Sequence, residues 1–207
     1  MSLARRGSVN MTTRLVVGIT GASGAILGVR LLEVLAGRRD VETHLVISAA
    51  AQRTIQAETD YTPLQVKALA HFAYDPDDIG ASIASGSFQT HGMVIIPCSI
   101  KTLSAVANCY AADLISRAAD VTLKERRPLV LVVRESPLHL GHLRQMVRAT
   151  QLGATIYPPV PAFYASPRSV DDVVNHIVGR ILAYTGFPNE LYTPWQGTVG
   201  GGHQDGG

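Results

Sequence analysis

Short apolar runs alternate with segments of helical periodicity along almost the whole chain, and this alternation restricts the fold more than any other feature. Five runs have the length and character of strands, at residues 14–19, 41–47, 93–96, 129–133 and 154–157. Between them the pattern predicts helices at 24–36, 49–58, 63–70, 100–108, 111–125 and 138–151. Strands that alternate with helices in this way form a parallel sheet.

The runs also indicate which kind of parallel sheet to expect. The segment from Leu129 to Val133 is apolar at every position, as in strands that are covered on both faces. A final helix is predicted with Ser169 as its N-cap, Asp172 three residues later and Gly186 beyond its end. We therefore predict an α/β fold: a three-layer, Rossmann-like (flavodoxin-like) parallel sheet with helices on both faces, in a single domain.

The length of 207 residues fits one such domain with short extensions. We predict a mobile extension at residues 1–12, the domain at 13–196 and a glycine-rich tail at 197–207. The apolar runs fall far short of the roughly 20 residues that a membrane-spanning helix needs. No secretory signal is visible, and Cys98 and Cys109 show no disulfide or metal spacing, so we expect a protein of the reducing cytoplasm.

Charged residues make up only 16% of the chain, against roughly 25% in typical soluble domains. This deficit indicates either that an oligomer buries much of the outer surface or that the protein dissolves poorly. The net charge of +2 provides no basic field of the kind that nucleic-acid binding demands. His139 and His142 are three residues apart without a third ligand, so no metal site is predicted.

Polar residues follow each predicted strand. In parallel α/β sheets, ligands bind beyond the carboxyl ends of the strands. Hydroxyl groups, glycines and single charges occupy these positions, at residues 20–25, at Ser48, and at residues 97–102, 134–136 and 158–164. One edge of the sheet is therefore predicted to carry a binding site.

The first of these segments favours a mononucleotide over a dinucleotide. Gly18, Gly21 and Gly24 do not match the G-x-G-x-x-G fingerprint, and Ser48 stands where a dinucleotide site needs an acid for the ribose. Glycine and serine let backbone amides approach a phosphate at a helix N-terminus, as FMN requires. A tight turn between strand and helix, without a ligand, is the alternative for this loop.

Two later segments also carry groups suited to binding. Residues 99–102 open a helix with two hydroxyls and an ammonium group, which suits an anion, although simple N-capping by Ser99 is the alternative. Arg134 and Glu135 follow a fully apolar strand, where a structural salt bridge is the alternative to a role in the site. Cys98 is expected to be a small buried residue rather than a nucleophile.

Together these motifs resemble the UbiX flavin prenyltransferases over about residues 14–196. The resemblance is carried by TGASGA at 20–25, ETD at 58–60, PCSIKTLSAVA at 97–107, RAADVTLKERRPLVLVVRE at 117–135, PAFY at 161–164 and Trp195. One departure is Ile79, which stands where some members have a Trp beside the prenyl group.

The resemblance implies an enzyme that transfers a dimethylallyl group from dimethylallyl monophosphate to N5 and C6 of reduced FMN, without a metal. The product, prenylated FMN, is the cofactor of UbiD-type decarboxylases, which would receive it. Members of the family form dodecamers, and such a homo-oligomer would explain the low charge content. The sequence does not distinguish ubiquinone synthesis from degradation of phenolic acids as the host pathway.

The resemblance also implies roles for individual residues. FMN would be held by Ala22, Ser23, Gly24, Ser48, Ser99, Ile100, Lys101, Thr102 and Arg134. The phosphate of the donor would be held by Tyr164, Arg180 and, from a neighbouring subunit, Lys124. The residues near the chemistry would be Glu135, Glu58, Ser23 and Lys124.

The chemistry leaves some choices open. Breaking the allylic C–O bond releases a phosphate whose developing charge arginine and lysine can stabilise without a metal. Either Glu135 or the departing phosphate would take the proton that C6 loses. Two other functions are a flavin-dependent decarboxylase of a cysteinyl substrate, whose conspicuous His and Asn-containing motif are not seen here, and a flavin carrier without catalysis in a decarboxylase complex.

Overall fold

The computed structural model describes residues 12–195 and 197. The predicted extension and tail lie outside this range, apart from Thr12 and Gly197. The chain divides into two compact units after Pro159, a point that the sequence does not mark with a linker. The first unit holds the sheet and the second holds the last helix, and each is described by itself below.

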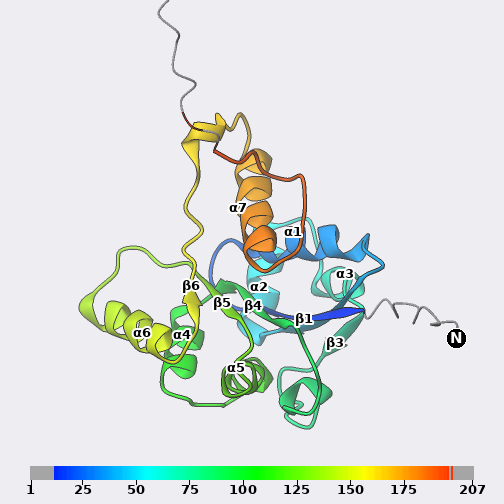
Figure 1. The fold of residues 1–207 in the computed structure, drawn as a ribbon, viewed down its shortest axis with the longest axis vertical. Helices are drawn as coiled ribbons and strands as arrows, with labels where there is room; N and C mark the ends of the chain where they lie inside the picture. The colour runs from blue at the N-terminus through cyan, green and yellow to red at the C-terminus, as the bar shows by residue number, and fades with distance from the viewer. Residues whose placement is uncertain (1–11, 196, 198–207) are drawn as a thin grey trace, which may run out of the picture. The chain divides into compact units, whose positions relative to one another are not determined.

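The first unit is built on six parallel strands in the order β3-β2-β1-β4-β5-β6 (Figure 1). Five of them confirm the predicted strands, and β3 is an addition. Its three residues are largely exposed, which explains why no apolar run marked it. The strands are β1 (Thr13–Ile19), β2 (Val41–Ile47), β3 (Phe72–Tyr74), β4 (Gly92–Cys98), β5 (Leu129–Val133) and β6 (Thr155–Ile156).

The helices of this unit lie close to the predicted positions. Two helices start later than predicted at a capping side chain. Asp113 and Ser116 form a capping box before Leu114, and the ring of His139 accepts a hydrogen bond from the amide of Gly141 before the helix that begins at Leu140. The helices are α1 (Ala25–Ala36), α2 (Ala49–Glu58), α3 (Pro63–Ala68), α4 (Ile100–Ala107), α5 (Leu114–Lys124) and α6 (Leu140–Gln151), with a short 3-10 helix η1 (Ser82–Ala84).

Helices cover both faces of the sheet, as predicted. Figure 1 shows α1 and α5 on opposite sides of β1 and β4. On one face α1 approaches the sheet so closely that a Cβ on its Gly28 would lie 2.5 Å from the carbonyl oxygen of Ile96. On the other face a Cβ on Gly18 would lie 3.3 Å from the side chain of Ile115 in α5. Every residue of β4 and β5 is consequently buried.

The strand order reverses between β1 and β4, which is where doubly wound sheets bind their ligands. A buried threonine joins the ends of these two strands. The hydroxyl of Thr20 donates to the carbonyl of Pro97 at 2.8 Å and accepts from the amide of Ser99 at 2.8 Å. The loops after β1 and β4 are therefore fixed to each other by one side chain.

The second unit consists of a short 3-10 helix, η2 (Phe163–Ala165), and α7 (Val170–Tyr184), followed by a return segment. The predicted capping box of Ser169 and Asp172 is confirmed, and Gly186 with φ +85° follows the helix. The return segment packs on α7, where the side chain of Asn189 donates to the carbonyl of Gly179 at 2.9 Å. Among the described residues of both units, no helix is long and apolar enough to cross a membrane.

Candidate active site

A cavity of about 540 Å³ lies at the carboxyl ends of the strands in the first unit. Its size falls in the range of small-molecule sites, roughly 300–1,000 Å³. The segments that follow β1, β2, β4 and β5 all contribute to it, as the sequence predicts. The lining residues are Gly21, Ser48, Ala49, Ala50, Pro76, Asp77, Ser99, Ile100, Lys101, Thr102, Ala112, Asp113 and Glu135.

The loop after β1 meets the cavity at Gly21, one residue before the predicted segment Ala22–Gly24. A Cβ on Gly21 would lie only 2.4 Å from the Cβ of Ala50, so a side chain does not fit between this loop and α2. The three predicted residues are not among those that line the cavity. The signal for Gly21 is present in the sequence, since it is the first of the two glycines of the TGASGA segment.

The N-terminus of α1 already holds an anionic group from the same chain. The amides of Gly24 and Ala25 donate to one carboxylate oxygen of Glu58, at 2.7 and 3.2 Å. Glu58 is the last residue of α2, as predicted for a residue at a helix end. Its carboxylate satisfies two amides that would otherwise lack a partner within the helix.

Two other helices begin at the cavity. The hydroxyl of Ser48 accepts from the amide of Ala51 at 3.2 Å, and that of Ser99 accepts from the amide of Thr102 at 3.3 Å. Both serines are thus N-caps, and both also line the cavity. Helix N-termini with hydroxyls, together with the ammonium of Lys101, favour a negatively charged ligand. These groups fit the phosphate of FMN, and the rest of the lining includes the acidic residues Asp77, Asp113 and Glu135.

The end of β5 contributes Glu135 to the cavity, while Arg134 is not among the lining residues. The carboxylate of Glu135 is exposed and accepts from the amide of Ser136 at 3.0 Å. The backbone amide of Arg134 donates to the carbonyl of Cys98 at 3.2 Å. Cys98 itself is fully buried, which raises the pKa of its thiol and confirms that it is a core residue.

Sequence reasoning missed the wall formed by Pro76, Asp77, Ala112 and Asp113. The amide of Leu114 donates to the carbonyl of Pro76 at 2.7 Å, which joins the segment after β3 to the start of α5. Because β3 was not predicted, the residues that follow it were not expected to lie at the edge of the sheet that carries the site. In the part of the chain that the structure describes, no three His, Cys, Asp or Glu residues gather as metal ligands.

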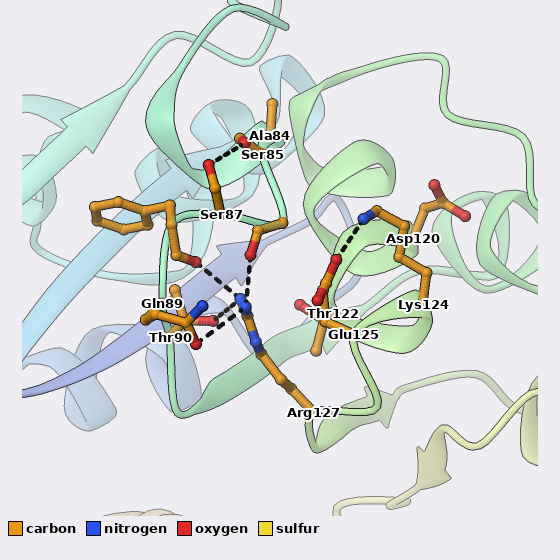
Figure 2. A network of polar contacts seen from close by, with 12 residues as sticks. Ala84, Ser85, Ser87, Gln89, Thr90, Asp120, Thr122, Lys124, Glu125 and Arg127 are labelled. Atoms are coloured by element: carbon orange, nitrogen blue, oxygen red, sulfur yellow. Dashed lines mark hydrogen bonds and ion pairs between the residues drawn. The ribbon is translucent and has the colours of Figure 1, made fainter.

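Lys124 lies in a second polar cluster, outside the lining of this cavity. It is the last residue of α5, and its ammonium contacts the carboxylate of Glu125 at 2.5 Å. That contact holds the pKa of Glu125 below its usual range. Next to this pair runs the segment from Ala84 to Thr90, named the 84–90 loop below, into which Arg127 donates hydrogen bonds (Figure 2).

The two remaining predicted residues, Tyr164 and Arg180, lie in the second unit, where aromatic rings hold them. The ring of Tyr164 packs edge-on against His176 and Trp195, at centroid distances of 5.6 and 5.3 Å. The guanidinium of Arg180 lies 5.3 Å from the ring centroid of Tyr192. Burial, and then the charge of Arg180, lower the pKa of His176.

His176 and Tyr192 were not predicted as site residues. In the sequence, His176 lies beside the apolar stripe of the last helix and belongs to no motif, and Tyr192 lies in a segment that no pattern distinguishes. The contacts to Tyr164 and Arg180 are the signal that marks them, and these contacts require the folded chain.

Comparison with known proteins identifies the family of the chain. The flavoprotein family model matches residues 4–182. A flavin prenyltransferase UbiX of Escherichia coli is 61% identical over 187 residues, which cover 89% of this chain and 98% of that protein. The crystal structure of AnUbiX in complex with FMN and dimethylallyl pyrophosphate is 49% identical, covers 89% of this chain and 98% of that one, and has a TM-score of 0.87.

Two further structures help to place the chain. A dodecameric FMN-dependent UbiX-like decarboxylase from Escherichia coli is 50% identical, covers 89% of this chain and 100% of that one, and has a TM-score of 0.88. The FMN-dependent cysteine decarboxylase SpaF is only 22% identical, with a TM-score of 0.56, and shares the fold alone. The chain therefore belongs to the flavoprotein family and, within it, to the UbiX flavin prenyltransferases.

Proposed function

We infer that this chain is a flavin prenyltransferase, which joins a dimethylallyl group to N5 and C6 of reduced FMN and so makes prenylated FMN. The observation that carries this function is the 61% identity to a UbiX flavin prenyltransferase over 98% of that protein's length. The cavity at the strand ends supports it, because its lining suits the phosphate of a mononucleotide. The proposed donor is dimethylallyl monophosphate, and a solved relative was crystallised with the corresponding pyrophosphate.

We propose that the cavity residues hold the flavin nucleotide. Ser48, Ser99, Ile100, Lys101 and Thr102 provide hydroxyls, helix N-termini and one ammonium group at the cavity. The roles of Ala22, Ser23, Gly24 and Arg134 in binding FMN stay predictions, and Gly21 is added to them because it lines the cavity. A Cβ at Gly21 would push this loop away from α2.

The remaining residues are proposed to act on the donor. When the allylic C–O bond breaks, both of its electrons leave with the phosphate, and the ammonium of Lys124 and the guanidinium of Arg180 stabilise the added charge. The hydroxyl of Tyr164 donates a hydrogen bond to the same phosphate. Glu135, whose carboxylate lines the cavity, accepts the proton that C6 loses, unless the departing phosphate accepts it.

We propose that twelve copies of the chain assemble and that α6 forms part of the contact between them. Within this helix, which the structure describes in full, only Ala149 is buried. Leu140, Leu143 and Val147 lie on one side of it and are 60%, 45% and 57% exposed. The dodecameric relative supports this assembly. Sedimentation is expected to give about twelve times the 22.1 kDa chain mass, and a monomer would contradict the proposal.

Product and location complete the proposal. Prenylated FMN would pass to a UbiD-type decarboxylase as its cofactor. We also propose a cytoplasmic location, which the two unpaired cysteines, Cys98 and Cys109, support because reducing compartments keep thiols free.

A mass measurement tests the reaction directly. The purified protein is mixed without oxygen with reduced FMN and dimethylallyl monophosphate, and the flavin is then weighed by mass spectrometry. An added five-carbon unit is expected, and an unchanged flavin mass would contradict the function. Incubation with a peptide that ends in cysteine, which should not lose carbon dioxide, separates this activity from that of a cysteine decarboxylase.

A further inference from the structure

The 84–90 loop is held in place by arginines from the neighbouring helix and the turn after it. Arg127 donates to the carbonyl of Gly86 at 2.7 Å and to that of Phe88 at 2.8 Å, and its Nη1 also contacts the hydroxyl of Thr90 at 3.3 Å. Arg117 donates to the carbonyl of Ala84 at 3.2 Å. Figure 2 shows the guanidinium of Arg127 directed into the loop. The backbone position of this loop therefore depends on two charged side chains.

The same loop touches the ion pair at the end of α5. A Cβ built on Gly86 would lie 2.6 Å from the ammonium nitrogen of Lys124 and 2.1 Å from a carboxylate oxygen of Glu125. The ammonium thus occupies space that only a glycine leaves open. The loop backbone is anchored by Arg127, so the wall on this side of Lys124 is fixed.

We propose that Gly86 and Arg127 are positioning residues for Lys124, which place its ammonium where the phosphate of the donor is bound. This inference rests on the proposed function, in which Lys124 stabilises the departing phosphate. A charge aids such a step only if it is held at the correct place before the bond breaks, because displacement weakens it in the transition state. Lys124 is a long side chain at a helix end with 47% of its surface exposed, so it needs an external constraint.

Gly86 offers a sensitive test because the cost to folding is expected to be small. The atoms that an added methyl group would meet belong to the ends of two flexible side chains, which can move, although the ion pair must then shift. Gly80 provides a matched control in the segment just before the loop, since a Cβ there would meet only Asp78, at 3.4 Å. Comparing the two alanine variants separates displacement of Lys124 from a general effect of substituting glycine.

In the first experiment, Gly86→Ala is expected to raise the KM for dimethylallyl monophosphate roughly tenfold. The affinity for FMN and the melting temperature should stay close to those of the wild type, and Gly80→Ala should leave all three quantities unchanged. In a Lys124→Met background, adding Gly86→Ala should change kcat/KM by less than twofold. An unchanged KM in Gly86→Ala, or an equal loss in both backgrounds, would overturn the proposal.

The second experiment addresses Arg127. Arg127→Gln is expected to raise the same KM, whereas Arg126→Gln, which removes the same charge from the adjacent exposed position, should not. If both variants act alike, net charge rather than loop position is responsible and the proposal fails. A crystal structure of Gly86→Ala supplies a readout independent of turnover, because an ammonium that has not moved would contradict the proposed contact. The wild type is assayed in parallel, and its failure to prenylate would count against the proposed function instead.

Discussion

The residues proposed for the flavin and those proposed for the donor are held in different ways. The flavin cavity is lined by backbone, small side chains and helix caps, such as Ser48 and Ser99, whose hydroxyls are fixed by amides of their own helices. Lys124, Tyr164 and Arg180 are exposed side chains that are held by contacts with other side chains, among them Glu125, His176 and Tyr192. The first set follows from the sheet topology, and the second depends on individual contacts.

This difference predicts how the two sets respond to mutation. A substitution of a capping serine in the cavity should alter flavin affinity and stability together, because the same hydroxyl caps a helix and lines the cavity. A substitution beside a donor residue should alter the KM for the donor and leave folding nearly intact. The predictions for Ser99 and Tyr192 test this contrast directly, and all the predictions below run from the largest expected effect to the smallest.

The largest effect is expected at Glu135, which belongs to the cavity but is proposed to act on the reaction. Glu135→Gln keeps the size of the side chain and removes the charge that accepts a proton. Turnover is expected to fall roughly 100-fold, as for a lost general base, with FMN still bound at wild-type affinity. Product is counted by mass spectrometry, and Glu190→Gln, at an exposed position of the second unit, serves as the control. Undiminished turnover would indicate that the departing phosphate, and not Glu135, accepts the proton that C6 loses.

A cap deletion probes the cavity itself. Ser99→Ala removes the hydroxyl that caps α4 and lines the cavity, so the free energy of unfolding should fall by about 1 kcal/mol and FMN should bind more weakly. Urea unfolding and fluorescence titration with FMN measure the two quantities. Ser169→Ala removes the equivalent cap from α7 and should lower stability without changing FMN affinity. Equal FMN affinity in both variants would contradict the proposal that the cap of α4 contributes to flavin binding.

A ring deletion probes a donor residue. Tyr192→Leu removes the ring above which the guanidinium of Arg180 lies. Such contacts at exposed sites are worth about 0.5–1 kcal/mol, so the KM for dimethylallyl monophosphate should rise roughly two- to fivefold. FMN affinity should not change. A rise in KM that persists when Arg180 is replaced by Met would show that the ring acts through something else.

The smallest effect concerns the pH dependence of stability. His44 is buried in β2 beside Glu42, Phe72 and Tyr74, and burial lowers its pKa below 6.5. As the pH falls from 7.5 to 5.5, the unfolded chain takes up this proton first, so the free energy of unfolding should decrease. Glu42, whose pKa is lowered from 4.5, titrates below this window. Urea unfolding of His44→Gln at both pH values should show a smaller decrease than the wild type, and an equal decrease would exclude His44 as the source.

The same contrast explains how much the sequence could predict. The sheet edge was predictable because each buried strand is an apolar run, and the polar residues that follow such runs must meet at one edge. The wall at Pro76 and Asp77 was not, because β3 has exposed side chains and leaves no apolar run. The contacts of Tyr164 with His176 and of Arg180 with Tyr192 join residues 12 positions apart in sequence, and no local pattern encodes them.

The role of Glu58 shows a similar limit. Its place at the end of α2 was predicted, and so was an anion at the start of α1. The structure shows that these two features satisfy each other, since the carboxylate binds the amides of Gly24 and Ala25. The sequence pattern could not reveal this pairing, because it joins residues more than 30 positions apart.

The hydroxyl of Thr20, shared between the strand ends of β1 and β4, has a consequence for affinity. Since one buried side chain ties both loops together, the mouth of the cavity is preorganised before any nucleotide arrives. A ligand that enters a rigid site loses less affinity to the ordering of the protein, so more of its contacts count towards binding. In this chain, one threonine hydroxyl at the point where the strand order reverses lowers the entropy cost of capturing the flavin.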